Sequence, residues 1–243
     1  MRVLALETSS STGSVAIVDA GDDPWAVEVI ASASASVSNA HGESLLPLVD
    51  GALRAARLEL SAIDLLAVGI GPGSFTGTRI GVATAKGIAI ATGRPLRGVD
   101  SFAALALDAG EVDRPIAVAI DARKGEVYVS AVRARLDRDD LVEVLVAPAH
   151  LPPARAFERL SAALGASFVA VGDGVPLVAE LSSARRRHVG REVPRAAAVA
   201  ALAARRHGRA FVDEVDVLEP LYVRPPDVTI PTRTPGLPGR PTK

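Results

Sequence analysis

One glycine-rich segment constrains the fold of this chain more than any other part of its sequence. It covers residues 69–81, follows the apolar residues 65–68 and leads into a helical pattern that lasts to about Thr92. A strand, a glycine turn and a helix in this order direct free backbone N–H groups at an anion. The spacing matches neither a Walker A loop nor the GxGxxG of a dinucleotide fold. A tight turn without a ligand explains the segment equally well, so the local chemistry leaves both interpretations open.

The composition indicates a large aliphatic core. Of the 243 residues, 49% are hydrophobic and only 3% are aromatic. So few aromatic side chains argue against a module that stacks nucleic-acid bases. The net charge of −1 gives no long-range attraction to RNA or to an anionic membrane. The chain has no cysteine, which excludes disulfides and thiolate metal sites and fits a cytoplasmic protein. We therefore expect a cytoplasmic protein without a membrane-spanning segment.

The first part of the chain alternates between strand and helix patterns. A strand over residues 3–6 and its hairpin partner over 14–18 flank a polar turn, and a third strand is expected over 25–36. The elements expected next are a helix over 44–57 with Ser44 as its cap and Pro47 in its first turns, a strand from Leu65, a helix from Ser74 to about Thr92, a strand over 95–99 and a helix from Ser101.

The second part of the chain repeats the opening pattern. Residues 116–120 form an apolar strand that ends at Asp121, and residues 126–132 return as its partner after a turn that contains glycine. Farther along, residues 168–171 read as a strand before a Gly-Asp-Gly turn, and residues 195–209 as an Ala-rich helix. Duplicated units of this kind predict an α/β protein with two lobes and a cleft between them.

This repetition also divides the chain. We expect a first lobe over residues 1–108 and a second over 114–224, with the Pro-rich residues 225–243 disordered. Two basic clusters, residues 185–188 and 205–207, are interpreted as solvated helix faces rather than as tRNA contacts. His41 and Glu43 are interpreted as part of a helix N-terminus rather than as an acid–base pair.

Four motifs follow one another in an order typical of one known family. They are Leu4-Ala5-Leu6-Glu7-Thr8-Ser9, His41-Gly42-Glu43-Ser44-Leu45-Leu46-Pro47, residues 71–81 and Asp121-Ala122-Arg123-Lys124-Gly125-Glu126-Val127-Tyr128. In these motifs the chain resembles the TsaB (YeaZ) family. The resemblance implies the two-lobed actin/Hsp70/sugar-kinase (ASKHA) fold with a reduced second lobe. It also implies a role in making N6-threonylcarbamoyladenosine at adenosine 37 of tRNAs that read codons beginning with A.

The resemblance further implies that this chain is a non-catalytic subunit and not an enzyme. Its expected partners are the paralogue TsaD as a heterodimer and the ATPase TsaE, with a pathway link to TsaC/Sua5, and tRNA is met mainly through the complex. Self-association through the same face stays open. ATP or ADP is expected at TsaE, and at most weakly on this chain. The expected partner interface lies on the helices after Ser44 and Ser74, at Leu45, Leu48, Val49, Ala52, Phe75, Gly77, Arg79, Gly81, Ala85 and Ile88.

The residues give independent reasons to expect no catalytic or metal site. TsaD-type proteins hold a metal through an HxxxH pair, and Ser101 and Leu105 stand at the corresponding positions here. A leucine cannot ligate a metal, so a metallopeptidase is disfavoured. An ATP-dependent small-molecule kinase of the same fold remains the alternative, although the first hairpin is poor in glycine. The residues expected to hold a nucleotide, if one binds, are Glu7, Thr8, Ser9, Gly71, Pro72, Gly73 and Asp121.

Small residues recur along the helix after Ser74. Gly77, Gly81, Ala85 and Ala89 form one narrow strip, on which another backbone can approach closely. The strip costs helix propensity, about 1 kcal/mol for each glycine relative to alanine. Packing on the first lobe's own sheet and packing on a partner both account for it, and the two are compatible because a helix has two faces.

Overall fold

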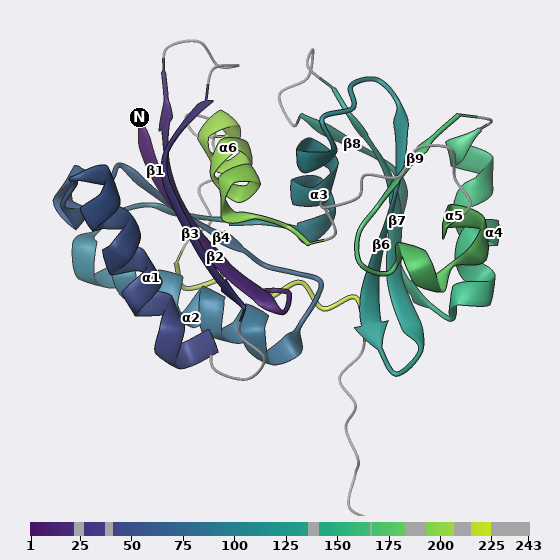
Figure 1. The fold of residues 1–243 in the computed structure, drawn as a ribbon, viewed down its shortest axis with the longest axis horizontal. Coiled ribbons are helices and arrows are strands. Elements are labelled where there is room, and N and C mark those ends of the chain that lie inside the picture. The colour runs from purple at the N-terminus through teal and green to yellow at the C-terminus, as the bar shows by residue number, and fades with distance from the viewer. Residues whose placement is uncertain are drawn as a thin grey trace, which may run out of the picture.

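Two β-sheets stand side by side with two helices between them (Figure 1). The computed structural model describes residues 1–21, 27–36, 41–135, 141–165, 167–182, 193–206 and 215–224, with the backbone alone at 41–44 and 206. The expectations for residues 25–26, 185–188, 207 and 225–243 and for the side chains of His41 and Glu43 lie outside this part of the chain. No helix of the described part combines the length and apolarity that a bilayer crossing needs.

The first sheet has the strand order β3-β2-β1-β4-β5. Its strands are β1 (Arg2–Glu7), β2 (Thr12–Ala20), β3 (Val27–Ser36), β4 (Leu65–Gly69) and β5 (Leu96–Val99). β1 pairs antiparallel with β2 and parallel with β4. Residues 3–6 of this central strand are fully buried, because side chains of alternate residues enter cores on both faces of the sheet.

The second sheet repeats this plan with fewer strands, in the order β8-β7-β6-β9. Its strands are β6 (Pro115–Arg123), β7 (Glu126–Ala134), β8 (Val142–Leu151) and β9 (Val169–Val171). As in the first sheet, an antiparallel hairpin is followed by a parallel strand, here β9 on β6. The expected α/β, two-lobed ASKHA fold with a reduced second lobe is thus confirmed.

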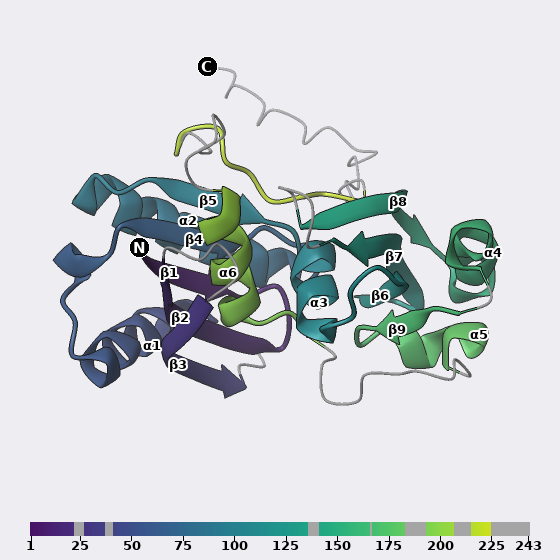
Figure 2. The same ribbon diagram turned by 90° about the horizontal axis from the view of Figure 1, so that it is seen from above.

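Helices cover both outer faces and fill the space between the lobes (Figures 1 and 2). The outer helices are α1 (His41–Ala56) and α2 (Phe75–Thr92) on the first sheet, and α4 (Pro153–Leu164) and α5 (Ala179–Ser182) on the second. α3 (Ser101–Ala109) and α6 (Ala196–Arg206) lie between the sheets in one shared core. α6 packs on β1, β2 and β4. The lobes are therefore not consecutive along the chain, since this late helix returns to the first sheet.

Of the two outer helices of the first lobe, α2 begins where the sequence predicted and α1 begins earlier. α2 begins directly after Ser74, whose hydroxyl accepts a hydrogen bond from the Gly77 N–H at 3.2 Å, as expected. α1 begins at His41, so the expected cap at Ser44 is wrong and Pro47 lies inside the helix. Leu45 and Val49 are buried in the outer core, so the side of the helix that the sequence pattern predicted to be apolar does pack there.

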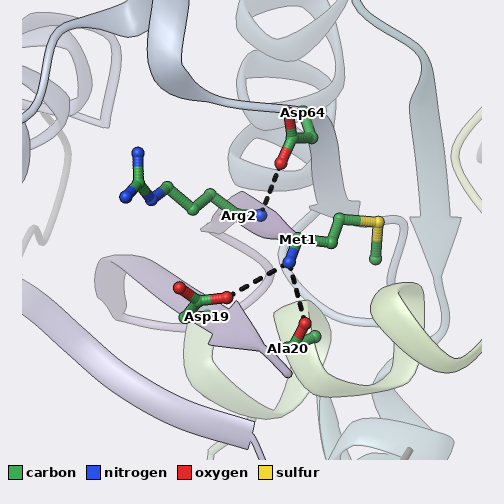
Figure 3. Close-up of polar contacts among 5 residues, drawn as sticks. All are labelled: Met1, Arg2, Asp19, Ala20 and Asp64. Carbon is green, nitrogen blue, oxygen red and sulfur yellow. Dashed lines mark hydrogen bonds and ion pairs between the residues drawn. The ribbon is translucent and has the colours of Figure 1, made fainter. Parts of the chain in front are cut away.

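Polar contacts connect the inner strands of the first sheet at one end of the sheet (Figure 3). The amino group of Met1 donates to the carbonyl of Ala20 at 2.8 Å and lies 3.2 Å from Asp19 Oδ1. The backbone N–H of Arg2 donates to Asp64 Oδ2 at 2.8 Å. These contacts join β1 to β2 and to the residue before β4, so they support the register of the central strands.

The inner helix α6 is held at its N-terminus by side chains from two distant elements. Ser14 Oγ on β2 accepts from the backbone N–H of Ala196 at 3.1 Å and so acts as a cap 182 residues away. Arg195 forms a two-point contact with the buried Asp108 of α3, at 2.6 and 3.1 Å. The hydrogen bonds to Asp108 raise the pKa of Arg195. The junction between the lobes therefore depends on this ion pair.

Replacing Arg195 by alanine should lower the free energy of unfolding by about 2 kcal/mol. The change removes both hydrogen bonds to a carboxylate that stays buried, and half of the Arg195 side chain is exposed, which reduces the cost below that of a fully buried pair. Urea denaturation measures the difference. The matched control is Arg54→Ala, whose ion pair with Asp50 is exposed and should contribute less than about 0.5 kcal/mol. Equal effects of the two variants would contradict this role of Asp108.

Candidate functional site: the cleft between the lobes

A cleft of about 590 Å³ opens between the two lobes. The first lobe contributes the turn after β1 and the start of α2, and the second contributes the ends of β6 and β9. Residues 220–224 line it from a third direction. The side chains that carry its chemistry are Ser9, Ser10, Ser11, Ser74, Thr76, Thr78, Asp121, Arg123, Tyr128, Asp173, Tyr222 and Arg224.

On the first-lobe side, the glycine turn rests directly on the turn after β1. The N–H of Ser74 donates to the carbonyl of Ser9 at 2.5 Å, and the N–H of Ser101 donates to the carbonyl of Gly71 at 2.7 Å. A Cβ at Gly73 would overlap the Ser9 carbonyl, so glycine is needed for this close approach. The hydroxyls of Ser9 and Ser101 lie 3.1 Å apart. These contacts fix the position at which α2 begins.

Glu7 lies beneath this junction, away from the cleft. Its side chain is fully buried, and Oε1 accepts a hydrogen bond from the Ser9 N–H at 2.5 Å. Oε2 lies against Gly69 and has no hydrogen-bond partner among the described residues. Desolvation by burial raises the pKa of Glu7 from 4.5 to about 7, against the opposing effect of hydrogen bonds from Ser9 and Thr8. The carboxyl group is therefore poorly suited to hold a metal–phosphate group in the cleft.

The second-lobe side of the cleft carries two aspartates and an arginine. The Asp121 N–H donates to Asp173 Oδ1 at 2.9 Å. Arg123 donates to the Asp121 carboxylate from its backbone at 2.7 Å and from its guanidinium at 3.1 Å. Burial is the main cause that raises the pKa of Asp173, and the nearby charge of Asp121 adds to it. Asp121 is thus paired with Arg123 on its own hairpin.

Four of the seven residues expected to hold a nucleotide meet in the cleft. Ser9, Pro72, Gly73 and Asp121 line it. The other three do not: Glu7 and Gly71 are buried, and Thr8 donates its hydroxyl hydrogen to the Gly77 carbonyl at 2.8 Å. Sequence reasoning missed Asp173 as a cleft residue, although its Gly-Asp-Gly turn after a strand was the available signal. Nucleotide binding stays a prediction.

The described residues include no cluster of three or more His, Asp or Glu side chains arranged to hold a metal ion. The two positions compared with the HxxxH pair lie on α3, where Ser101 and Leu105 are both fully buried. Leu105 belongs to the core shared by the two lobes. These side chains contribute packing and one hydroxyl contact.

Most of the expected partner interface is enclosed by this chain's own core. Six of its ten residues are buried beneath α1 and α2, namely Leu45, Val49, Ala52, Gly77, Gly81 and Ala85. A Cβ at Gly81 would overlap the Thr8 hydroxyl, so the small-residue strip faces β1. Packing of the strip on the first lobe's own sheet is confirmed. These six positions lie in the core of this chain, and a partner interface on these two helices stays a prediction. Leu48 and Ile88 are half-buried, and Phe75 and Arg79 are exposed.

A second row of residues lies on the exposed side of α2. Thr76, Ala83, Gly87 and Ile90 are exposed at helical spacing, and Ile90 is 72% exposed. On α1, Leu46 is 57% exposed. Sequence reasoning missed Leu46 and Ile90 because the buried strip accounted for the small residues. The available signal was that the opposite side of the same helix also carries small and apolar residues, beside its two charged residues Arg79 and Lys86.

A cluster of Phe75, Arg79 and Tyr222 lies at the end of this exposed surface, beside the cleft. The Arg79 guanidinium lies 3.8 Å from the centre of the Phe75 ring, and its Nε donates to the Tyr222 hydroxyl at 3.0 Å. The rings of Phe75 and Tyr222 are 5.8 Å apart. Phe75 and Tyr222 remain about half exposed.

Two sheets of the same plan, a cleft between them and paired inner helices define a protein of the ASKHA class. Comparison with known proteins narrows the class. The family model described as "TsaD: tRNA N6-adenosine threonylcarbamoyltransferase" matches residues 29–227. The Escherichia coli "tRNA threonylcarbamoyladenosine biosynthesis protein TsaB" is 33% identical over 176 residues, which cover 72% of each chain. The Haemophilus influenzae protein of the same name is 35% identical over 145 residues, 59% of this chain and 58% of that protein.

Solved structures agree with these sequence matches. "YeaZ from Pseudomonas aeruginosa" superposes with a TM-score of 0.76 at 29% identity, covering 91% of this chain and 99% of the other. A second Pseudomonas aeruginosa structure, described as an uncharacterized protein with similarity to peptidase YEAZ, gives 0.78 at 31% identity and covers 92% and 99%. The chain belongs to the TsaB (YeaZ) family.

Proposed function

We propose that this chain is a non-catalytic subunit of the machinery that makes N6-threonylcarbamoyladenosine in tRNA. It acts as a heterodimer with a TsaD-type transferase, together with the ATPase TsaE. The observation that carries the proposal is the match to relatives named for this biosynthesis over most of the described chain. The partner carries out the transfer, and this chain stabilises the partner's active arrangement by binding to it.

The buried state of α3 supports a non-catalytic role. A metal-dependent transferase site would need ligating side chains that reach the cleft from this helix. Here Leu105 lies in the core and the Ser101 hydroxyl contacts Ser9. Neither side chain is available as a ligand at the cleft surface.

The cleft also favours the subunit over a small-molecule kinase. Phosphoryl transfer needs Mg²⁺ held by carboxylates close to the phosphates. The first-lobe residues that line this cleft supply hydroxyl groups, while the carboxyl group of Glu7 is buried beneath them with a raised pKa. On the opposite side, Asp121 is paired with Arg123. The arrangement is therefore poorly matched to a metal–nucleotide complex.

The surface proposed for the transferase is the exposed side of α1 and α2. It combines a row of small residues with the exposed apolar side chains of Leu46, Phe75 and Ile90. Small residues allow a partner helix to approach closely, and exposed apolar side chains gain from burial. Arg79 adds a side chain of the kind enriched at the centres of interfaces.

Ile90→Glu should weaken binding of the TsaD-type partner by about 10- to 100-fold, because it places a charge in an apolar contact. Stability of the isolated chain should not change, since Ile90 is 72% exposed. Titration calorimetry with the partner measures the first effect and thermal unfolding the second. Leu177→Glu, at an exposed leucine of the second lobe, is the matched control and should leave the affinity unchanged. Equal affinities of the two variants would place the interface elsewhere.

The direct test is reconstitution of the pathway. TsaC, TsaD, TsaE, tRNA, threonine, bicarbonate and ATP are combined with and without this chain, and N6-threonylcarbamoyladenosine is measured in the tRNA. We expect synthesis to require the chain, and the chain alone to hydrolyse no ATP and phosphorylate no acceptor. Full synthesis without the chain would overturn the proposed role, and ATP turnover by the chain alone would restore the kinase alternative.

A further inference from the structure

Residues 215–224, here called the strap, run across one side of both lobes (Figure 2). Their first half is attached to the first lobe. Leu218 is buried in the outer core beside α1 and α2, and Lys86 Nζ on α2 donates to the Asp216 carbonyl at 3.4 Å. The N–H of Leu221 donates to the carbonyl of Ile70 at 2.8 Å. The strap is therefore part of the first lobe up to this point.

The next residue of the strap joins the exposed side of α2. The Tyr222 hydroxyl accepts a hydrogen bond from Arg79, and the Tyr222 ring lies beside Phe75. The Arg79 guanidinium is held against both rings, 3.8 Å from the centre of Phe75 and 5.7 Å from that of Tyr222. Cation–π contacts of this kind contribute about 0.5–1 kcal/mol where they are exposed to solvent. Phe75 and Arg79 thus belong both to the proposed partner surface and to the attachment of the strap.

The last residue of the described strap reaches the second lobe. Arg224 Nη1 lies 3.6 Å from Glu126 Oε2, on the hairpin between β6 and β7. Val223, between the two attachments, packs on the core shared by the lobes. Glu126 also lies 2.9 Å from His150 Nε2 on β8, which supports the carboxylate from the second lobe's own side.

The strap is short between these attachments. Tyr222 and Arg224 are two residues apart, and an extended chain spans at most about 3.6 Å per residue, or about 7 Å in all. The lobes therefore cannot separate by more than a few ångströms at this edge while both contacts persist. Residues 220–224 also line the cleft, so the strap limits its opening directly.

We propose that the strap couples partner docking on α2 to closure of the cleft between the lobes. The coupling rests on the proposed function, because it assigns the partner to the exposed side of α2. A partner that covers Phe75 and Arg79 excludes water from their contacts with Tyr222, and exclusion of water strengthens the hydrogen bond and the cation–π contact. The more firmly held Tyr222 keeps Arg224 at Glu126. Docking on one lobe thereby favours the closed arrangement of both.

The absence of cysteine from the chain allows a clean measurement of the distance between the lobes. Glu59→Cys in the first lobe and Ala154→Cys on α4 place a donor and an acceptor dye at exposed positions. Single-molecule energy transfer then reports the distribution of interlobe distances. Tyr222→Ala removes the contacts of the strap with Phe75 and Arg79, while Leu218 and Leu221 still hold the strap to the first lobe. Arg224→Gln removes the attachment to the second lobe. The matched control is Arg133→Gln, because the ion pair of Arg133 with Glu143 lies within the second lobe and away from the residues that line the cleft.

In the isolated chain, we expect Arg224→Gln to broaden the distance distribution and lengthen its mean, and Tyr222→Ala to do so less, because Leu218 and Leu221 still hold the strap to the first lobe. The double variant should do no more than Arg224→Gln alone, because one connection can be cut only once. The control variant should show the same distance distribution as the chain with the unchanged strap. Additive effects of the two variants, or no effect of Arg224→Gln, would overturn the strap as a connection between the lobes. Circular dichroism confirms that each variant is folded before it is compared.

Saturating TsaD-type partner tests the coupling itself. With the unchanged strap, the partner should narrow the distribution and shorten its mean. With Tyr222→Ala, the partner should still bind at saturation, but at least half of the shift should be lost. Binding without any shift in the unchanged chain would overturn the coupling and leave the proposed function standing. A partner that does not bind would overturn the proposed function and the coupling together, whereas the strap itself is judged on the isolated chain.

Discussion

Replacing Glu7 by glutamine should remove a pH dependence from the stability of the chain. In the unchanged chain, the free energy of unfolding should fall by about 3 kcal/mol between about pH 4.5 and pH 7, and the variant should lack this fall. Glu7 is fully buried, and desolvation raises its pKa from 4.5 to about 7. Below pH 4.5 the carboxyl group is protonated in both the folded and the unfolded chain. Over the interval between the two pKa values, the unfolded chain releases the proton first.

The sign of the effect follows from this order. Within the interval the folded chain binds more protons than the unfolded chain, so its stability decreases as the pH rises and levels off above the folded pKa. Glutamine does not titrate, and the variant lacks this decrease. Its side-chain oxygen can still accept the Ser9 hydrogen bond, while its amide occupies the place of Oε2. That amide adds a constant offset in stability, which cancels when two pH values are compared.

Urea denaturation at pH 5 and pH 8 measures the change. The stability of the variant relative to the unchanged chain should increase by about 2–3 kcal/mol between these two pH values. Glu59→Gln, at an exposed glutamate before the short turn of helix that precedes β4, is the matched control and should follow the unchanged chain. A parallel pH dependence for Glu7→Gln and the unchanged chain would mean that Glu7 is charged at neutral pH in the folded state. The kinase alternative would then regain its carboxylate.

The elements that the sequence predicted best are those whose signals are local. For α2 the cap at Ser74 and the glycine after Thr92 are both present in the sequence, and both ends are observed where expected. The start of α1 was misplaced by three residues, because a Ser before an apolar run is a local start signal that also fits inside a helix, and helix ends are the least certain part of a sequence pattern. For α6 the Ala-rich pattern predicts a helix but does not tell which sheet it covers, since its cap comes from Ser14.

The candidate site shows the same division between local and long-range information. Asp121 was predicted for the cleft because an acidic residue follows an apolar strand, and it lines the cleft. Glu7 follows its strand in the same way, yet it is buried because the glycine turn packs on Ser9 and encloses it. The buried and exposed sides of α2 could not be told apart from spacing, since small residues occupy both. Only the packing of Gly81 against Thr8 distinguishes them.

Gly172→Val should destabilise the chain by about 4 kcal/mol and displace Asp173 from the cleft. Gly172 has φ +107°, a conformation that β-branched residues avoid. A Cβ at this position would also overlap the Ala119 carbonyl, which accepts the Gly174 N–H at 3.0 Å. The two penalties, each about 1–3 kcal/mol, fall on one residue and add together. Because β9 pairs with β6 directly before this turn, the turn cannot move without breaking the contact between Asp173 and Asp121.

Gly93→Val separates the two penalties. Gly93 ends α2 with φ +65°, and a Cβ there meets nothing within 4 Å. It should therefore show the cost of the backbone conformation without the overlap, about 1–2 kcal/mol. Urea denaturation gives both values, and backbone amide chemical shifts of Asp121 report whether the Asp173 contact is lost in Gly172→Val alone. If the two variants were equally destabilised, the close packing of the turn after β9 on the backbone of β6 would not hold Asp173 in place. The second lobe's side of the cleft would then owe its arrangement to the pairing of Asp121 with Arg123.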